Sequence, residues 1–409
     1  MKSRQNESKK LEYKFVFITP VWGVEYMRMF SDVCLPMMLT DGNLNKFRDR
    51  SDACFVIVCG GDDFRALKSS EAYRRLCDVV QVEIVLIDGM IDTGRTHSAM
   101  TKCYQLGMSI EGVVPGFTNF VFLTPDSFWS DGSFEYAERI MDSGKKALVT
   151  VGLRTNREAM IPILNSAIAR TKGTAAPFNN REIAGLAIRH LHQLGRAHLW
   201  FSKAFLNSWP SNIYWKVDDE LLISHNFHMH PLVVRCPKRR RNINIKSTID
   251  GDYLIKVGLT GGNVHVVTDS DALLGIELSP RTRDWGGVEL REPRLRSVQW
   301  FGLNYANRMH WKFFGQRVVI KARDLKKEDG VFFRHSDEIV KIVSRVHWVA
   351  RLLYPFHLIS ILRLLLKVAI FVKAQCKTFF SGMTRFVKRI LIRMFIGRSR
   401  RSWSTEKVD

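Results

Sequence analysis

A single carboxylate follows a short apolar strand in the first third of the chain. Residues 120–123 read Phe-Val-Phe-Leu, a run that predicts a strand buried on both faces of a parallel sheet. Pro125 cannot donate to a sheet ladder, so the strand ends there and delivers Asp126 to the carboxyl edge of the sheet. Open α/β folds bind their ligands at this edge. Asp131, slightly further on, is either a second site residue or the cap of the helix that follows.

Two earlier predicted strands also end in small or acidic residues. Thr19 and Pro20 follow the strand at 13–18. The strand at 53–58 is followed by Gly60, Gly61, Asp62 and Asp63. Glycines let a ligand approach the backbone, one carboxylate can accept hydrogen bonds from a ribose or base, and another can hold a divalent cation against phosphates. Together with Asp126, these strand ends predict a site for a nucleotide and its diphosphate. The sequence lacks the Gly-x-Gly-x-x-Gly and Gly-x-x-x-x-Gly-Lys-Ser/Thr motifs, which disfavours a dinucleotide-binding fold and a P-loop NTPase.

Two later segments carry residues that could reach the same site. Arg154 follows the predicted strand 147–151 and would contact a donor phosphate or an acceptor, or else lie in a solvated loop. His228 and His230 are two residues apart in a segment predicted to be extended, so their side chains are expected on one side of it. They are interpreted either as ligand contacts or as ordinary strand histidines.

A second acidic cluster lies further along the chain. Asp250 and Asp252 flank a glycine and fit several uses: a general base toward an acceptor hydroxyl, a clamp on sugar hydroxyls, further metal ligands, or a common turn. Asp269 and Asp271 follow another predicted strand in the same manner. We interpret these two as weaker site candidates, on the acceptor side.

The elements that would position these residues alternate regularly. Predicted strands and helices follow one another through the first two hundred residues, at spacings typical of βαβ crossovers. The predicted strands are 13–18, 53–58, 82–87, 120–123 and 147–151. The expected fold class is therefore α/β, with a mostly parallel sheet and helices on both faces.

This arrangement resembles the GT-A glycosyltransferases, which transfer a sugar from a nucleotide-sugar donor. Thr124-Pro125-Asp126 stands where that family has its Asp-x-Asp motif, with Thr124 in place of the first acid. The resemblance implies that Asp126 binds a divalent metal ion, Mn²⁺ or Mg²⁺, with Asp131 as a possible second ligand and His228 or His230 as the late histidine of the family.

The same resemblance assigns two further groups of residues. A general base, as inverting members require, would be Asp250 or Asp252. The nucleotide pocket would be lined by Thr19, Pro20, Asp62 and Asp63. The likeness covers roughly the first half of the chain and rests on the order of the elements and on their strand ends.

Charge and cysteine content limit the compartment and the partners. The net charge is +22, and fourteen Lys and Arg residues lie between 339 and 405 without a single Asp or Glu. This charge accompanies apolar helix faces rather than a nucleic-acid-binding motif, so nucleic acid is disfavoured as a partner. The seven cysteines show no Cys-x-x-Cys spacing and residues 1–14 lack an apolar core, so a reducing cytoplasm and no secretory signal are expected.

The C-terminal tail alternates apolar blocks with single cations. Its longest uncharged run, 352–362, is about half of the roughly twenty residues that a transmembrane helix needs. Basic amphipathic helices lying on an anionic membrane surface explain the pattern better. The alternative is a packed helical appendage or a partner-binding coil.

The sequence thus predicts a cytoplasmic glycosyltransferase held peripherally at the inner face of the cell membrane. Its acceptor would be lipid-linked or a cell-surface glycan. The alternatives are a sugar-nucleotide nucleotidyltransferase and a non-enzymatic basic membrane-surface adaptor. The expected organisation is a disordered N-terminus (1–12), a GT-A-like domain (13–336, nucleotide-binding to about 155 and acceptor-binding beyond) and a membrane-association tail (337–409).

Overall fold

The computed structural model describes residues 11–89, 96–171, 176–238, 249, 251–281 and 290–353. The chain divides into two compact units, 1–340 and 341–409. The first unit holds all the strands named below. Its helices are α1 (Val24–Met29), α2 (Leu35–Met38), α3 (Gly61–Lys68), α4 (Glu71–Cys77), α5 (Thr96–Gly107), α6 (Ser133–Asp142), α7 (Arg157–Thr171), α8 (Asn180–Arg189), α9 (Gln193–Arg196), α10 (Gly251–Lys256), α11 (Leu295–Tyr305), α12 (Arg308–Phe314) and the start of α13 (Gly330–Leu353).

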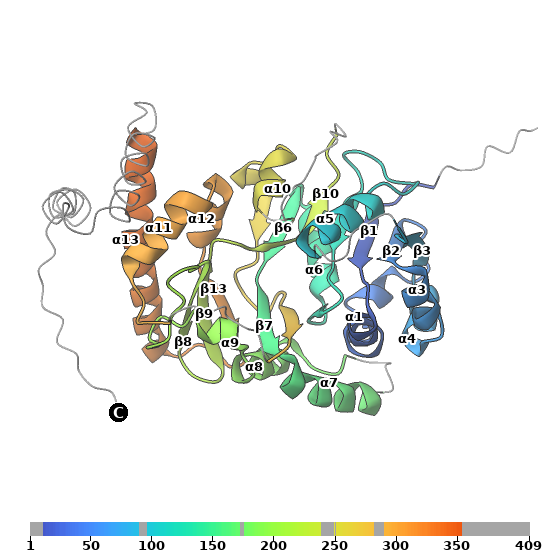
Figure 1. Cartoon of the computed structure of the whole chain (residues 1–409), viewed down its shortest axis with the longest axis horizontal. Coiled ribbons are helices and arrows are strands. Elements are labelled where there is room, and N and C mark those ends of the chain that lie inside the picture. The colour runs from blue at the N-terminus through green and yellow to red at the C-terminus, as the bar shows by residue number, and fades with distance from the viewer. Residues whose placement is uncertain are drawn as a thin grey trace, which may run out of the picture. The chain divides into compact units, whose positions relative to one another are not determined.

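A seven-stranded sheet in the order β11-β6-β10-β4-β1-β2-β3 forms the centre of this unit (Figure 1). Its strands are β1 (Phe15–Pro20), β2 (Ala53–Cys59), β3 (Gln81–Leu86), β4 (Asn119–Phe122), β6 (Ala147–Thr150), β10 (His230–Arg235) and β11 (Val264–Val266). All neighbouring pairs are parallel except those of β10 with β4 and β6. The predicted mixed α/β architecture with a mostly parallel sheet is confirmed.

Successive residues of β1 show that helices cover both faces of the sheet. Side chains alternate along a strand, and all six residues of β1 are buried. The ring of Phe17 packs against Phe134 of α6, with centroids 5.1 Å apart. On the other face, Ile18 lies against Gly107 of α5, so closely that a Cβ added there would be 2.4 Å from Ile18 Cγ2.

Strand β10 separates β4 from β6 and runs against both. Pro231 lies near its start, where the pairing with β6 shifts register between Pro231 and Val233. Proline lacks the N–H that a regular ladder requires, and an irregularity in the ladder accommodates it. The predicted extended segment 227–234 is shorter than expected. Strand β9 ends at Asn226 and β10 begins only at His230, so residues 227–229 belong to neither strand.

Two three-stranded sheets complete the first unit. One has the order β5-β12-β7 and carries the candidate site; the other has the order β13-β9-β8. Their strands are β5 (Ser127–Trp129), β7 (Gly152–Asn156), β8 (Asn212–Lys216), β9 (Leu221–Asn226), β12 (Gly275–Ser279) and β13 (Val318–Lys321). Since β5 follows β4 and β7 follows β6 almost directly, the first of these sheets begins where the central strands end.

Most of the predicted tail and the N-terminal segment 1–10 lie outside the described residues. Of the tail, the structure describes only the part of α13 that reaches residue 353. No helix in the described parts of the chain is long and apolar enough to cross a membrane. Membrane association of the tail stays a prediction.

The close contact of α5 with β1 gives a test of the fold. Gly107→Ala would place a methyl group against the buried Ile18, so we expect it to lower the free energy of unfolding by about 1–3 kcal/mol. The control is Gly152→Ala at the start of β7, where an added Cβ has no heavy atom within 4 Å. Denaturant unfolding measures both variants; equal stabilities would contradict the packing described here.

Candidate active site

Asp126 lies in the short connection between β4 and β5, beyond the carboxyl end of the central sheet. The Leu278 N–H donates to the Asp126 carbonyl oxygen at 2.8 Å. This bond continues the antiparallel pairing of β5 with β12, in which Ser127 lies opposite Glu277. The pairing therefore places a second carboxylate next to Asp126, contributed by a residue far away in the sequence.

An arginine completes this cluster. Strand β7 pairs with β12 in parallel register, with Arg154 opposite Glu277. The Arg154 Nη2 and Glu277 Oε1 atoms lie 2.6 Å apart. The Ser279 hydroxyl donates to the same Glu277 oxygen at 3.1 Å. We call Asp126, Glu277 and Arg154 the carboxylate cluster.

The carboxylate cluster alters the acidity of Asp126. Burial, and secondly the charge of Glu277, raise the pKa of Asp126 to about 6. A hydrogen bond with Thr124 and the Arg154 guanidinium act in the opposite direction. A carboxyl group with a pKa near neutrality can exchange a proton or bind a cation at physiological pH.

Neutral hydroxyl and thiol groups surround Asp126. Burial, followed by the charge of Asp126, raises the pKa values of Tyr26, Cys34 and Tyr104. The Tyr104 hydroxyl donates to the Leu123 carbonyl oxygen at 2.6 Å, which holds the end of β4 against α5. These groups stay protonated at neutral pH, so the negative charge of the site remains on the two carboxylates.

The donor chemistry of the carboxylate cluster suits a hard divalent cation. Mg²⁺ and Mn²⁺ prefer carboxylate oxygens, and a cation would relieve the repulsion between Asp126 and Glu277. Within the described ranges, however, no group of three or more His, Cys, Asp or Glu side chains is placed to hold a metal ion. The predicted metal dependence stays a prediction.

The predicted nucleotide-contacting residues lie at the ends of β1 and β2. Thr19 and Pro20 form the last two positions of β1 and are buried. The Thr19 hydroxyl is fully buried and has no hydrogen-bond partner among the described residues. Asp62 and Asp63 lie in the first turn of α3 rather than in a loop.

The two acids of α3 face different surroundings. Asp63 Oδ2 accepts a hydrogen bond from the Gly23 N–H at 3.1 Å, which joins the ends of β1 and β2. Asp62 points to solvent and pairs with Arg65 one helical turn along. Of the pair, Asp63 is thus the one directed toward the neighbouring strand end. Nucleotide contact by any of these residues stays a prediction.

The two predicted histidines do not share one side of a strand. His228 lies in the connection before β10, and its ring centroid is 4.4 Å from that of His310. His230 begins β10, stacks on Trp129 at 5.7 Å, and its Nε2 lies 2.7 Å from the Phe122 carbonyl oxygen. The expectation that both point to one site is wrong, because the chain turns at 227–229. Only His230 lies beside the strand end that leads to Asp126.

Of the predicted pair Asp250 and Asp252, the structure describes only the second. Asp250 lies outside the described residues. Asp252 is the second residue of α10, and its carboxylate accepts a hydrogen bond from Asn307 Nδ2. Burial lowers the pKa of the neighbouring His310, and the charge of Asp252 acts in the opposite direction. The role of Asp252 as a general base stays a prediction.

Asp131 holds two loops together. Its Oδ1 accepts hydrogen bonds from the Thr40 hydroxyl at 2.6 Å and from the Gly42 N–H at 3.1 Å. The interpretation of Asp131 as a helix cap is wrong, since Gly132 is the N-cap of α6 and no side chain accepts a capping hydrogen bond there. The loop contact explains the residue without a ligand, and its predicted metal role stays a prediction.

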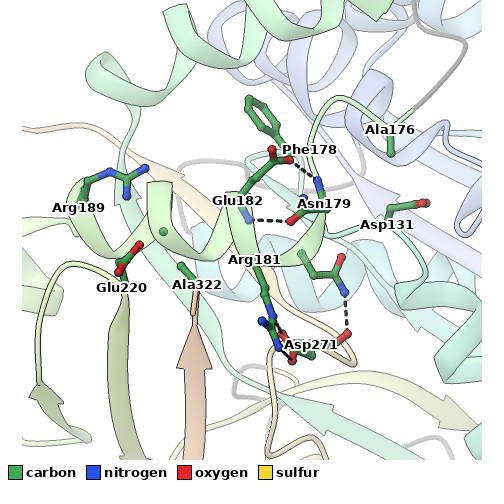
Figure 2. Close-up of a pocket in the computed structure, with 12 residues that line it drawn as sticks. Asp131, Ala176, Phe178, Asn179, Arg181, Glu182, Arg189, Glu220, Asp271 and Ala322 are labelled. Atoms are coloured by element: carbon green, nitrogen blue, oxygen red, sulfur yellow. Dashed lines mark hydrogen bonds and ion pairs between the residues drawn. The ribbon is translucent and has the colours of Figure 1, made fainter. Parts of the chain in front are cut away.

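Asp131 also lines an open cavity of about 860 Å³ around the start of α8 (Figure 2). Arg181 crosses this cavity to Asp271, with Nη2 and Oδ2 3.1 Å apart, and also pairs with Asp324. Arg189 and Glu220 line the cavity too and have no ion-pair partner in the described part of the chain. The predicted acceptor-side acid Asp271 is therefore paired with an arginine, whereas Arg189 and Glu220 make no ion pair among the described residues.

Sequence reasoning missed Glu277, Tyr26 and Tyr104. Glu277 had a visible signal: it is a charged residue in the middle of the apolar strand Gly275–Ser279. The two tyrosines carry no such signal, because tyrosines on helices are ordinary packing residues.

Comparisons with known proteins give no family for this chain. No protein-family model matches, and neither does any curated protein sequence. Three solved structures resemble part of it. These are TarS of S. aureus (12% identity, 35% of this chain and 22% of that chain, TM-score 0.25), a putative glucose-1-phosphate thymidylyltransferase of Bacillus anthracis in complex with a sucrose (14%, 34% and 55%, 0.22) and mouse xyloside xylosyltransferase 1 in its apo form (8%, 36% and 56%, 0.22).

The similarity to these structures is partial on both sides. It covers about a third of this chain and less than two thirds of each of the three, at low TM-scores. The function is therefore inferred from this chain's own residues.

The raised pKa of Asp126 predicts an unusual stability profile. Between about pH 4 and pH 6 the folded protein binds more protons at this carboxyl than the unfolded chain does, so its stability falls as the pH rises. Asp126→Asn removes this effect. We expect the variant to be more stable than wild type by about 1–3 kcal/mol at pH 7.5 and nearly equal at pH 4.

Asp131→Ala is the matched control. It removes an acceptor from Thr40 and Gly42, so a loss of about 1–2 kcal/mol is expected. Denaturant unfolding at several pH values distinguishes the two residues. If Asp126→Asn were less stable than wild type at pH 7.5, the ionised Asp126 carboxylate would not be destabilising in the folded protein, contrary to the description above.

Proposed function

We propose that the first unit is a GT-A-like glycosyltransferase that moves a sugar from a nucleotide-sugar donor to a glycan or glycolipid acceptor. The observation that carries the proposal is the carboxylate cluster. It lies beyond the carboxyl ends of parallel strands, where α/β folds bind ligands, and its central carboxyl group has a pKa of about 6. The ends of β1 and β2, joined through Asp63 and Gly23, supply the adjoining surface for a nucleotide.

The residues of the cluster share two tasks in the proposed reaction. Asp126 and Glu277 would hold a divalent cation, which when bound offsets the charge of the departing nucleoside diphosphate. Arg154 fixes the Glu277 carboxylate through its ion pair. Sheet pairing on both sides of β12 holds this geometry rigid, so little reorganisation is needed during the reaction.

The acceptor must lose a hydroxyl proton as the new glycosidic bond forms. Asp252 is the proposed general base, placed at the start of α10 and held by Asn307. The cavity beside α8, which Asp252 does not line, is the proposed site for sugar units of the acceptor away from the reacting hydroxyl, since Arg189 and Glu220 can hydrogen-bond to sugar hydroxyls and Phe178 offers a ring for stacking. The predicted tail would keep the enzyme at the inner face of the membrane, near a lipid-linked acceptor.

Turnover of sugar nucleotides tests the proposal directly. Full-length protein is incubated with a panel of sugar nucleotides and Mg²⁺ or Mn²⁺, and release of nucleoside diphosphate is measured. We expect Asp126→Asn and Glu277→Gln to lower the rate by about 100-fold or more, because each removes charge from the reacting centre. Glu71→Gln is the control, since Glu71 on α4 faces solvent and pairs with Arg74 one helical turn along; its rate should stay within about twofold of wild type.

Two results would overturn the assignment. Equal turnover by wild type and Asp126→Asn would remove Asp126 from the reaction. Release of pyrophosphate from a nucleoside triphosphate and a sugar phosphate, without sugar transfer, would show a nucleotidyltransferase instead.

A further inference from the structure

Large aromatic side chains gather on the surface around α11. Trp209 and Trp300 are each 45% exposed, Tyr305 is 46% exposed and Leu290 is 37% exposed. The rings are in contact: the centroids of Trp209 and Tyr305 lie 4.7 Å apart, and those of Trp300 and Tyr305 lie 5.5 Å apart. A contiguous exposed apolar patch of this kind marks an interaction site more often than isolated surface residues do.

The backbone beneath these rings is well fixed. Phe205 pairs with Arg291 through an N–H to carbonyl bond of 2.7 Å, and Asn207 Nδ2 donates to the Glu292 carbonyl oxygen at 3.0 Å. Trp209 packs edge-on against the buried Phe301 of α11, with centroids 4.9 Å apart. The rings therefore belong to a preformed surface, not to a frayed loop tip.

Arginines lie close in sequence to the ring-bearing residues of α11, and Arg296 lies one helical turn before Trp300. The described stretch 290–312 contains one acid, Glu292. Arg294, Arg296 and Arg308 are exposed and make no ion pair with any described residue. The other exposed cation is Arg291. We call Trp209, Trp300, Tyr305 and these arginines the aromatic–arginine face.

We propose that the aromatic–arginine face docks onto a lipid bilayer rich in anionic phospholipids. Trp and Tyr rings favour the headgroup region of a bilayer, where an apolar body and a polar edge are both accommodated. Arginines beside them are attracted by anionic headgroups, each by about 1 kcal/mol. The excess of cations over acids favours a phosphate-bearing surface over a neutral glycan, which would be held by a mixture of hydrogen-bond donors and acceptors.

This docking surface is distinct from the predicted membrane role of the tail. It is part of the folded first unit, and it does not depend on the proposed reaction. A protein docked through this folded face would also be held at a fixed angle to the bilayer.

Vesicle sedimentation of the full-length protein measures the affinity. With vesicles of phosphatidylcholine and phosphatidylglycerol, we expect Arg294→Gln/Arg296→Gln/Arg308→Gln to weaken binding by about tenfold or more. Trp300→Ser/Tyr305→Ser should weaken it to a similar degree. The matched control is Lys68→Gln/Lys102→Gln/Arg170→Gln, which removes three exposed cations from other helices and should change binding by less than about twofold.

A fluorescent label separates docking of this face from binding by the tail alone. An environment-sensitive dye is attached to the cysteine of the Asn304→Cys variant, made in a Cys77→Ser/Cys376→Ser background. A second variant in the same background carries the dye at Lys68→Cys. On vesicles the dye at 304 should shift to the blue and be quenched by nitroxide-labelled lipids, whereas the dye at 68 should remain in water.

Two outcomes would overturn the proposal. In the first, the protein sediments with vesicles but the dye at 304 stays in water, which would leave the tail as the membrane contact. In the second, soluble neutral oligosaccharides shift the dye at 304 and vesicles do not, which would make the face a glycan site. Both readouts are independent of catalytic turnover.

Discussion

The antiparallel pairing of β5 with β12 is the constraint on which the candidate site depends. It brings Glu277 to Asp126, and the pairing of β12 with β7 then adds Arg154. The negative charges of Asp126 and Glu277 repel each other, and the Arg154 guanidinium offsets only part of that repulsion. The folded chain therefore holds a charge arrangement that costs stability, as functional sites commonly do.

The central sheet supplies the rigid support for this arrangement. Strand β1 is buried along its whole length, with Phe17 directed to one helix layer and Ile18 to the other. Close approach of α5, made possible by Gly107, leaves little room for β1 to move. The strand ends that face the site are consequently held in place by the core.

Much of the fold could be predicted from the sequence, because buried parallel strands are continuous apolar runs and the helices between them are amphipathic. The position of Asp126 followed from Pro125, a local signal. Glu277 could not be paired with it in advance, since the register of β12 is set by contacts between residues about 150 positions apart. The histidine prediction failed for a local reason: extended geometry was assumed through 227–229, where the chain turns.

The position of β10 has a consequence for how the chain is made. Because β10 inserts between β4 and β6, those two strands are not neighbours, and the central sheet stays open during synthesis until residues beyond 230 have left the ribosome. A nascent chain that ends earlier would present the unpaired edges of β4 and β6, which are templates for association with other chains. The nucleotide-facing and acceptor-facing halves of the sequence are thus a single folding unit, and a gene encoding only the first half would not be expected to yield a soluble domain.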